Sequence, residues 1–447
     1  MSAPTAPPPA RVDEPGPPAG RVAELRELSK TTPGVLILFT AALVLVSVLV
    51  GVFTAVTVQS RAQALDDLAG SSGPLSIAAQ DIYRSLSDAD ATANSAFLAG
   101  GLEAADVRAR YDADIAQAES ALAVAVAARE PADLADPTGP LAVLSGKLSV
   151  YTGLVETARA NNHQGLPIGA AYQREASSLM RDELLPAAEQ LYRDETARLA
   201  DDQDSASSLP VVEILLGLVA LGVLFFAQRF VRRRTRRRLN TGLAIATGAA
   251  LVSLLWVLIA TAGVAANVDA SRDDGSTQTD VLARARIAAL AARADETLTL
   301  VARGSGAEFE EDYGKVRDQL TGDRGLLEQA ASLASDGAVR DKITAATANL
   351  RSWHEVHVDI RTADDSGDYA KAVGLTIGRG DDSAAVRFDK VDTNLREAIA
   401  ATTTTFDDEV SQASNALTGT VIGVILLALV MAAGSVAGIW QRLKEYR

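Results

Sequence analysis

Histidine is the residue best suited to acid–base or metal chemistry, and this chain of 447 residues has only three. His354 and His357 stand close together, with Glu355 and Asp359 beside them. Residues three or four apart share one face of a helix, so these side chains could form a metal-binding cluster. The competing interpretation, which we favour, is a solvated edge of a helix.

No motif for nucleophilic catalysis or phosphate binding accompanies the histidines. The Gly-Ser-Gly sequence at 304–306 is too short for a phosphate-binding loop and is typical of a turn. The chain has no cysteine, which excludes disulfides, cysteine-ligated zinc and thiol catalysis. We therefore expect a protein that is not an enzyme, with no catalytic residue, no metal site, no cofactor and no nucleic-acid partner.

Arginine is the residue type that could bind a ligand here, because its guanidinium pairs with carboxylates and phosphates. Arg159 and Arg361 are 202 residues apart, and each could hold the α-carboxylate of an amino acid. A charge at the rim of a helical bundle is the alternative for both. Tyr151 and Trp353 have the same separation and could contact a partner protein, with core packing as their alternative.

A second group of arginines lies in the short strip 229–240, between two apolar stretches. The group consists of Arg232, Arg233, Arg234, Arg236, Arg237 and Arg238. Clustered guanidinium groups can bind anionic membrane lipids or a cytosolic protein. The same charges also set membrane topology, because cytoplasmic loops are rich in arginine and lysine. We favour the topological role, which is compatible with docking.

Four long stretches of low charge separate the polar parts of the chain. They are residues 34–58, 209–228, 241–268 and 417–441. Each can cross the roughly 30 Å apolar core of a bilayer as a helix. Glu213 is their one charged residue, and its place near the end of the second stretch predicts a position at the membrane interface.

The charges of the remaining segments divide them between the two sides of the membrane. Segments 59–208 and 269–416 carry net charges of −12 and −11, whereas segments 1–33, 229–240 and 442–447 together carry +9. The positive-inside rule therefore predicts that both termini are cytosolic and that both acidic segments lie outside the cytoplasm. The excess of arginine over lysine and the abundant alanine suggest a bacterial cytoplasmic membrane.

Both acidic segments have a helical composition without the alternating pattern of strands. Turn residues divide each segment into four helical pieces. The turns of the first fall at 71–74, 100–101, 131–140 and 162–167, and those of the second at 303–306, 336–337, 364–368 and 378–382. Each segment is therefore expected to form an up-down four-helix bundle. The last helix, with an apolar stripe that runs toward Leu417, is expected to continue into the membrane unbroken.

The two halves of the chain repeat one layout. Three further pairs share the separation of 202 residues: Leu98 and Leu300, Tyr111 and Tyr313, and Leu148 and Leu350. A constant separation over several helices favours duplication over chance. The predicted fold is an all-α integral membrane protein, with four transmembrane helices and two extracytoplasmic four-helix bundles in a tandem repeat.

Two further patterns bear on partners. The proline-rich tail 1–33 is expected to be extended, with a short amphipathic helix at 21–30 that can lie on the membrane or bind a partner. The spacings Gly419-x-x-x-Gly423 and Gly434-x-x-x-Gly438 allow close approach of membrane helices. They can serve packing within one chain or a homodimer.

This layout is that of a receptor more than of a transporter, because no broken intramembrane helix or buried ion-binding carboxylate is evident. It resembles bacterial chemoreceptor-type sensors, in which two chains supply the four membrane helices that one duplicated chain supplies here. Only residues 442–447 follow the last stretch, so we expect any signal to pass to a separate protein.

Over most of its length the chain also resembles the GlnX-type membrane sensors of actinobacteria, with the segment 350–373 among the similar stretches. The resemblance implies that a solute-binding lipoprotein, GlnH, reports aspartate or glutamate, and that the signal reaches the cytosolic serine/threonine kinase PknG. Two alternatives stay open. The bundles can bind a small molecule directly, or the protein can be a membrane scaffold that does not switch.

Overall fold

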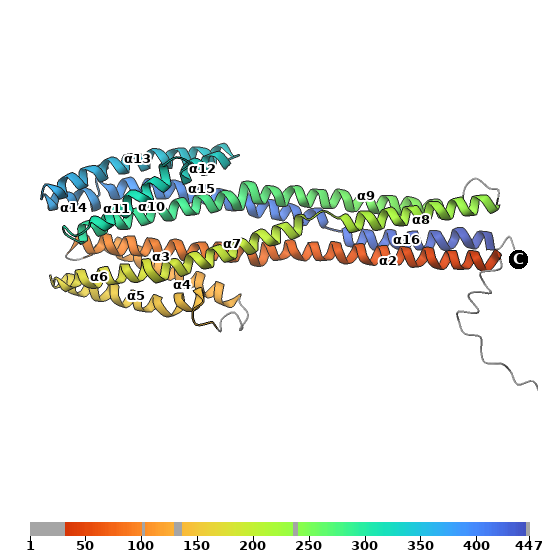
Figure 1. Ribbon diagram of the computed structural model, residues 1–447, viewed down its shortest axis with the longest axis horizontal. Helices are drawn as coiled ribbons and strands as arrows, with labels where there is room; N and C mark the ends of the chain where they lie inside the picture. Colours follow the sequence, from red (N-terminus) through yellow and green to blue (C-terminus); the bar gives the residue numbers. More distant parts are fainter. Residues whose placement is uncertain (1–31, 101–102, 129–135, 236–239, 444–447) are drawn as a thin grey trace, which may run out of the picture. The chain divides into compact units, whose positions relative to one another are not determined.

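The computed structural model is helical throughout the residues that it describes, which are 32–100, 103–128, 136–235 and 240–443 (Figure 1). No strand occurs among these residues, as the sequence predicts. The amphipathic helix predicted at 21–30 lies outside them. The chain divides into two compact units. The membrane unit comprises the described parts of 1–58, 210–259 and 419–447, and the bundle unit comprises 59–209 and 260–418.

Four helices contribute to the membrane unit: α2 (Thr32–Asp67), α8 (Val211–Thr235), α9 (Thr241–Ala270) and α16 (Thr420–Leu443). They contain the four predicted stretches except for residues 209–210 and 417–419, and each is long and apolar enough to cross a membrane. Large apolar side chains such as Phe225 and Ile259 are 65% and 72% exposed, as expected of side chains that face lipid. The chain is therefore a multi-pass membrane protein.

The second of the two predicted glycine pairs, Gly434 and Gly438, packs against another helix of this unit. A Cβ atom on Gly242 of α9 would lie 2.4 Å from the backbone nitrogen of Gly438 and 2.5 Å from the carbonyl oxygen of Gly434. Only glycine allows the two backbones to approach so closely. The Nδ2 atom of Asn240 also donates a hydrogen bond of 2.8 Å to the carbonyl of Gly438. The motif at 434–438 thus serves packing within the chain.

The described residues of the first bundle (59–209) form four long helical segments. They are α3 (Gly73–Ala99), α4 (Ala105–Ala127), α5 (Pro140–His163) and a continuous helix formed by α6 (Ile168–Leu179), the π-helical η3 (Met180–Leu184) and α7 (Leu185–Ser207). The break predicted at 71–74 is wrong, because the π-helical η1 (Leu68–Ser72) joins α2 directly to α3. The wider π turn gives room to the ring of Pro74, which would crowd the preceding turn of a regular α-helix.

The second bundle, residues 260–418, also has four long helices. They are α10 (Thr277–Val301), α11 (Ala307–Thr321), α13 (Gly337–Asp365) and α15 (Ala384–Leu417). Two short helices, α12 (Leu326–Leu333) and α14 (Tyr369–Ile377), lie between them. The turn before α12 was not predicted. It contains Arg324, whose φ of 60° is unusual for a residue with a side chain.

The two bundles repeat one another in detail. The π-helical η4 (Ser271–Ser276) joins α9 to α10, just as η1 joins α2 to α3. The last long helix of each bundle ends before the next helix begins, α7 at Ser207 and α15 at Leu417. The unbroken helix predicted through Leu417 is therefore wrong. Gly419 interrupts it with a φ of 78°, a left-handed conformation that glycine adopts without strain.

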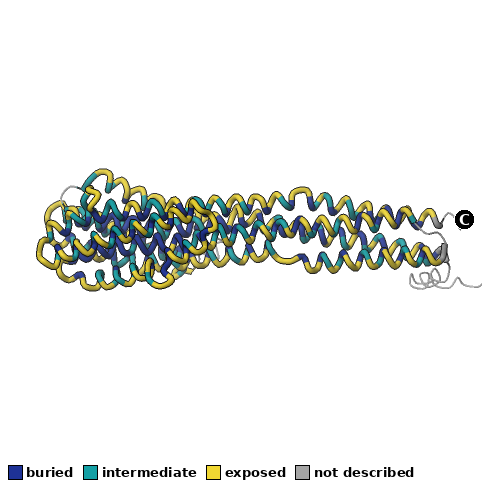
Figure 2. The backbone as a smooth tube through the Cα atoms, turned by 90° about the horizontal axis from the view of Figure 1, so that it is seen from above, coloured by how far each residue is buried: buried dark blue, intermediate teal, exposed yellow. Residues whose placement is uncertain are grey.

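Buried residues lie along the inside of the helical bundles (Figure 2). Each bundle has its own apolar core. In the first, Tyr151 packs with Ile82, Leu144 and Leu191, and in the second, Trp353 lies among the buried apolar side chains. The two bundles also pack on one another, mainly through α3 and α10. This contact brings charged side chains of the two halves together.

Candidate ligand site between the two bundles

A buried group of charges joins the bundles where α3 meets α10. Arg286 of α10 is 2% exposed. Its Nε atom donates a hydrogen bond of 2.5 Å to Asp392 of α15, and its Nη2 atom lies 3.4 Å from Asp88 of α3. Arg110 of α4 adds a second ion pair to Asp88, at 3.0 Å. Loss of one partner would leave a buried charge uncompensated, so breaking this group is costly.

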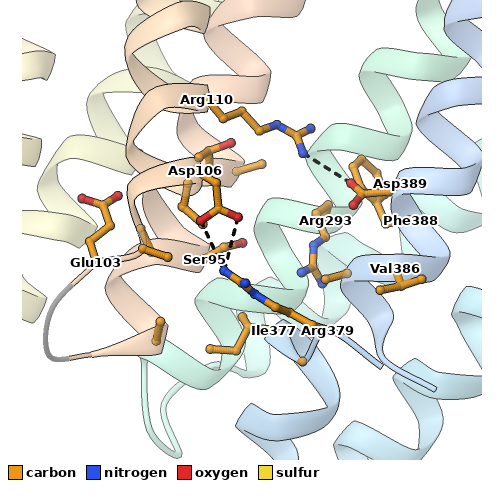
Figure 3. Close-up of a pocket in the computed structure, with 18 of the residues that line it drawn as sticks. Ser95, Glu103, Asp106, Arg110, Arg293, Ile377, Arg379, Val386, Phe388 and Asp389 are labelled. Carbon is orange, nitrogen blue, oxygen red and sulfur yellow. Dashed lines mark hydrogen bonds and ion pairs between the residues drawn. The ribbon is translucent and has the colours of Figure 1, made fainter. Parts of the chain in front are cut away.

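Beside this group lies a cavity of about 470 Å³, formed by both bundles (Figure 3). Its walls come from α3, α4, α10, α15 and the turn after α14. The volume lies within the usual range for small-molecule sites. Seven charged residues line it, and they are Asp88, Glu103, Asp106, Arg110, Arg293, Arg379 and Asp389.

Arg293 is the most buried of the cationic groups in this lining, with 4% of its surface exposed. Its Nη1 atom pairs with Glu296, and its Nη2 atom donates a hydrogen bond of 2.9 Å to the carbonyl of Thr376. The guanidinium also lies 6.0 Å from the centre of the Phe388 ring. These contacts orient the group, and a guanidinium has five N–H donors in all. The remaining donors can bind a carboxylate.

Two exposed ion pairs cross from one bundle to the other at the cavity (Figure 3). Arg110 lies 3.3 Å from Asp389, and Arg379 lies 3.2 Å from both carboxylate oxygens of Asp106. Exposed pairs of this kind stabilise a protein by at most about 1 kcal/mol, because water screens them. They can therefore open at low cost. The lining contains both signs of charge, which suits a ligand that also carries both.

Apolar side chains complete the lining. Ala91, Ala96, Val107, Ile377 and Phe388 supply surface without hydrogen-bonding groups. A mostly apolar wall with a few placed charges is typical of sites for small molecules, since the charges fix the orientation of the ligand. The arrangement can bind a small zwitterion.

The arginines singled out from the sequence do not line this cavity. Arg159 pairs with Glu103 at 2.8 Å and lies 4.9 Å from the centre of the Tyr111 ring. Arg361 pairs with Glu310 at 3.4 Å and with Asp364 at 2.8 Å. Both guanidinium groups therefore already have carboxylate partners within their own bundle.

Tyr151 and Trp353 occupy equivalent places in the two cores. They are 0% and 1% exposed, which leaves no ring surface for a partner protein. The Tyr151 hydroxyl donates a hydrogen bond of 3.3 Å to Asp90, and Nε1 of Trp353 donates one of 3.0 Å to Glu296. Each aromatic residue thus anchors a buried carboxylate. Their role in the structure is core packing.

The interpretation of 354–359 as a solvated edge is wrong for His357, which is buried. Its Nδ1 atom lies 3.1 Å from a carboxylate oxygen of Glu296, and its Nε2 atom lies 3.1 Å from one of Glu310. The ring stacks on Tyr313, with 3.7 Å between centres. The apolar stripe of α13 turns this residue inward, since Trp353 lies one turn earlier on the same face. Within the described segments no cluster suited to a metal ion occurs.

The arginine strip is only partly described. Arg232 and Arg233 are exposed near the end of α8, and Arg234 belongs to the last turn of this helix. Arg236, Arg237 and Arg238 lie outside the described residues. The strip therefore continues to be a predicted contact for lipid or a cytosolic partner.

Comparison with known families identifies the first bundle. Residues 64–204 match the family model of an actinobacterial sensor domain. The matched segment contains α3 to α6 and most of α7. The match supports a sensor protein of actinobacterial type, in keeping with the expectation that the chain is not an enzyme. Neither the comparison with curated proteins nor the one with solved structures found a match.

The repeat also explains why sequence reasoning missed Arg293. The separation of 202 residues pairs Arg293 with Ala91, and both line the cavity. The first half therefore has no equivalent arginine, and a search for paired arginines selects Arg159 and Arg361 instead. The buried Arg286 is paired with Arg84, which is partly exposed and bonds to Asp81 in its own helix. The site could have been found from the equivalent positions at which one half has an arginine and the other does not.

Proposed function

We propose that this chain is a transmembrane sensor of extracytoplasmic amino acids that signals to a separate cytosolic serine/threonine kinase. The observation that carries the proposal is the cavity between the bundles, with the buried Arg293 in its wall. In this proposal the bundle unit lies outside the cytoplasm of a bacterial cell, and both termini are cytosolic. The acidic bundles and the basic strip support this orientation.

The ligand class follows from the charges of the lining. Arg293 can receive an α-carboxylate, and the carboxylates of Asp88 and Asp389 can receive the ammonium group. Arg110 and Arg379 offer cationic groups to a second carboxylate. An acidic amino acid such as aspartate or glutamate meets all three requirements. The resemblance to GlnX-type sensors implies the same two amino acids.

Ligand binding would act on both bundles at once, because each contributes to the cavity. A ligand that replaces the exposed pairs of Arg110 and Arg379 changes the contacts between the halves. Coupling energies of roughly 1–3 kcal/mol are typical of such linked sites and suffice to shift a two-state equilibrium. A scaffold that does not switch would show no such change when the ligand binds.

The resemblance implies two protein partners, which we include in the proposal. A GlnH-like lipoprotein would deliver or report the amino acid outside, and a PknG-like kinase would receive the signal inside. Delivery by the lipoprotein and direct binding of the free amino acid both use the cavity as the input. They differ in whether the purified chain alone binds the amino acid.

The test is calorimetric titration of the full chain in lipid nanodiscs with aspartate, glutamate and glutamine. Replacing Arg293 with Gln should weaken binding by about 10- to 100-fold, because a hydrogen bond to a charged group contributes about 1.5–3 kcal/mol. The matched control is Arg361→Gln, outside the cavity, which should leave affinity unchanged. Equal effects of the two changes would contradict the assignment of the cavity.

A second titration uses the lipoprotein in place of the free amino acid. Binding that appears only with the lipoprotein, and that depends on its amino acid, would establish the relay route. Crosslinking in cells should then recover the kinase in amounts that change with aspartate or glutamate. Constitutive recovery, insensitive to amino acids and to Arg293→Gln, would instead establish a scaffold and overturn the proposal.

A further inference from the structure

A row of buried charges leads from the ligand cavity into the core of the second bundle. Arg293 of α10, in the wall of the cavity (Figure 3), pairs with Glu296 of the same helix. The other carboxylate oxygen of Glu296 lies 3.1 Å from Nδ1 of His357 on α13. We propose that His357, acting through Glu296, is a positioning residue for the bound ligand: its positive charge offsets the negative charge of Glu296 and leaves Arg293 able to hold a carboxylate. The proposal rests on the ligand site proposed above.

The carboxylate of Glu296 has more than one cationic or donor partner. Besides pairing with Arg293, it accepts a hydrogen bond of 3.0 Å from Nε1 of Trp353 and contacts His357. With a protonated His357, the group of Arg293, Glu296 and His357 carries one net positive charge. A buried charge without compensation is costly, and the carboxylate of a ligand at Arg293 would remove this cost. A simple pair of Arg293 and Glu296 would have no such excess charge.

His357 keeps its proton at neutral pH. Burial alone would lower the pKa of its imidazole, but hydrogen bonds to Glu296 and Glu310, and the charges of both, raise it to about 9. Both ring nitrogens then donate, Nδ1 to Glu296 and Nε2 to Glu310 at 3.1 Å each. Arg361 lies 3.4 Å from Glu310. The ring is therefore fixed between two carboxylates in its charged form.

Five helices enclose this cluster. Its polar and aromatic groups are Arg293 and Glu296 of α10, Glu310 and Tyr313 of α11, Trp353, His354, His357 and Arg361 of α13, the carbonyl of Thr376 of α14, and Phe388 of α15. Burial raises the pKa of Tyr313, and burial and the charge of Arg317 lower that of His354. His357 is therefore the imidazole of the cluster whose charge changes near pH 9.

The two halves of the chain differ at all the members of this row together. The separation of 202 residues pairs Arg293 with Ala91, Glu296 with Asn94 and His357 with Val155. Core packing alone does not require that three residues on two helices differ together. A charged unit does, because loss of one member leaves another buried charge without compensation. The unit belongs to the half that supplies the buried arginine to the cavity.

The proposal predicts that the ligand and the proton on His357 strengthen each other's binding. The chain has three histidines, so NMR of isotope-labelled imidazole nitrogens can follow each one in the wild-type chain in lipid nanodiscs. One signal should titrate near pH 9. Saturating aspartate or glutamate should raise this midpoint by about 0.7 pH unit or more, because coupled sites typically change each other's affinity by about 5-fold or more.

Calorimetric titration of two variants gives a second readout. His357→Gln should weaken the binding of aspartate or glutamate by about 5-fold or more at neutral pH. Its affinity should also change less than that of the wild type as pH rises through about 9. His354→Gln is the matched control on the same helix and should keep the affinity and the pH profile of the wild type. The ammonium group of the ligand titrates in all three proteins, so its effect cancels in the comparison.

Failure of this proposal can be told apart from failure of the proposed function. A wild-type chain that binds neither aspartate nor glutamate would overturn both. Binding that leaves the midpoint of His357 unchanged, or a His357→Gln profile parallel to that of the wild type, would overturn the positioning role alone. The absence of any histidine signal that titrates near pH 9 would do the same. Because the midpoint is measured in the wild-type chain, this result does not depend on the folding of a variant.

Discussion

His357 carries the most direct pH prediction of the structure. Burial alone would lower the pKa of its imidazole, but hydrogen bonds to Glu296 and Glu310, and the charges of these carboxylates, raise it from 6.5 to about 9. A raised pKa means that the folded state holds the proton more tightly than the unfolded chain does. The resulting stabilisation is complete below pH 6.5 and is lost as pH rises through about 9.

The size of the effect follows from the shift. One pKa unit corresponds to 1.36 kcal/mol, so the shift is linked to roughly 3 kcal/mol of unfolding free energy. Domains of ordinary stability unfold with about 5–15 kcal/mol, so this loss is a large part of the total. The bundle unit should therefore become markedly less stable between neutral and alkaline pH.

The assay can use Trp353, which donates to the same carboxylate oxygen of Glu296 that His357 contacts. The chain has three tryptophans, and replacement of Trp256 and Trp440 by Phe leaves Trp353 as the fluorescent reporter. Its fluorescence in the native chain should titrate near pH 9. Chemical unfolding in nanodiscs should show the loss of stability over the same range.

Two variants test the assignment. His357→Gln should abolish the titration and flatten the dependence of stability on pH. His354→Gln is the control, because burial and the charge of Arg317 lower the pKa of His354, so it should leave the transition near pH 9 in place. A transition at the ordinary histidine pKa of 6.5, or an unchanged slope in His357→Gln, would refute the reasoning.

Two further predictions concern stability, measured by chemical unfolding. Arg286→Met should cost about 3–5 kcal/mol, because Asp392 loses its buried partner, and addition of Asp392→Asn should recover part of this loss in a double-mutant cycle. Additive losses would show that the pair does not interact. Gly275→Ala should cost about 1–3 kcal/mol, because the new Cβ would lie 3.0 Å from Cα of Phe406. Gly314→Ala, with no atom within 4 Å of the new Cβ, should stabilise by about 0.5–1 kcal/mol, and equal effects of the two alanines would contradict the close contact.

The sequence alone determined the helical class, the four membrane stretches and the repeat. These properties can be read from the sequence itself, because the length of an apolar run and the spacing of equivalent residues do not depend on tertiary contacts. Helix ends were less certain. The turn residues at 71–74 predicted a break where the chain forms a π turn, and the helix expected through Leu417 ends there. Whether a glycine or proline interrupts a helix depends on what packs beside it.

Only the tertiary structure decided where charge is buried. Equivalent positions in the repeat drew attention to Arg159 and Arg361, whereas the cavity uses Arg293, whose equivalent is Ala91. His357 lies between two carboxylates from other helices, and Glu213 lies inside the membrane unit. The chemistry of each group follows from neighbours that are distant in sequence. Burial and partners set the cost of a charge, and both arise only when helices from different parts of the chain pack together.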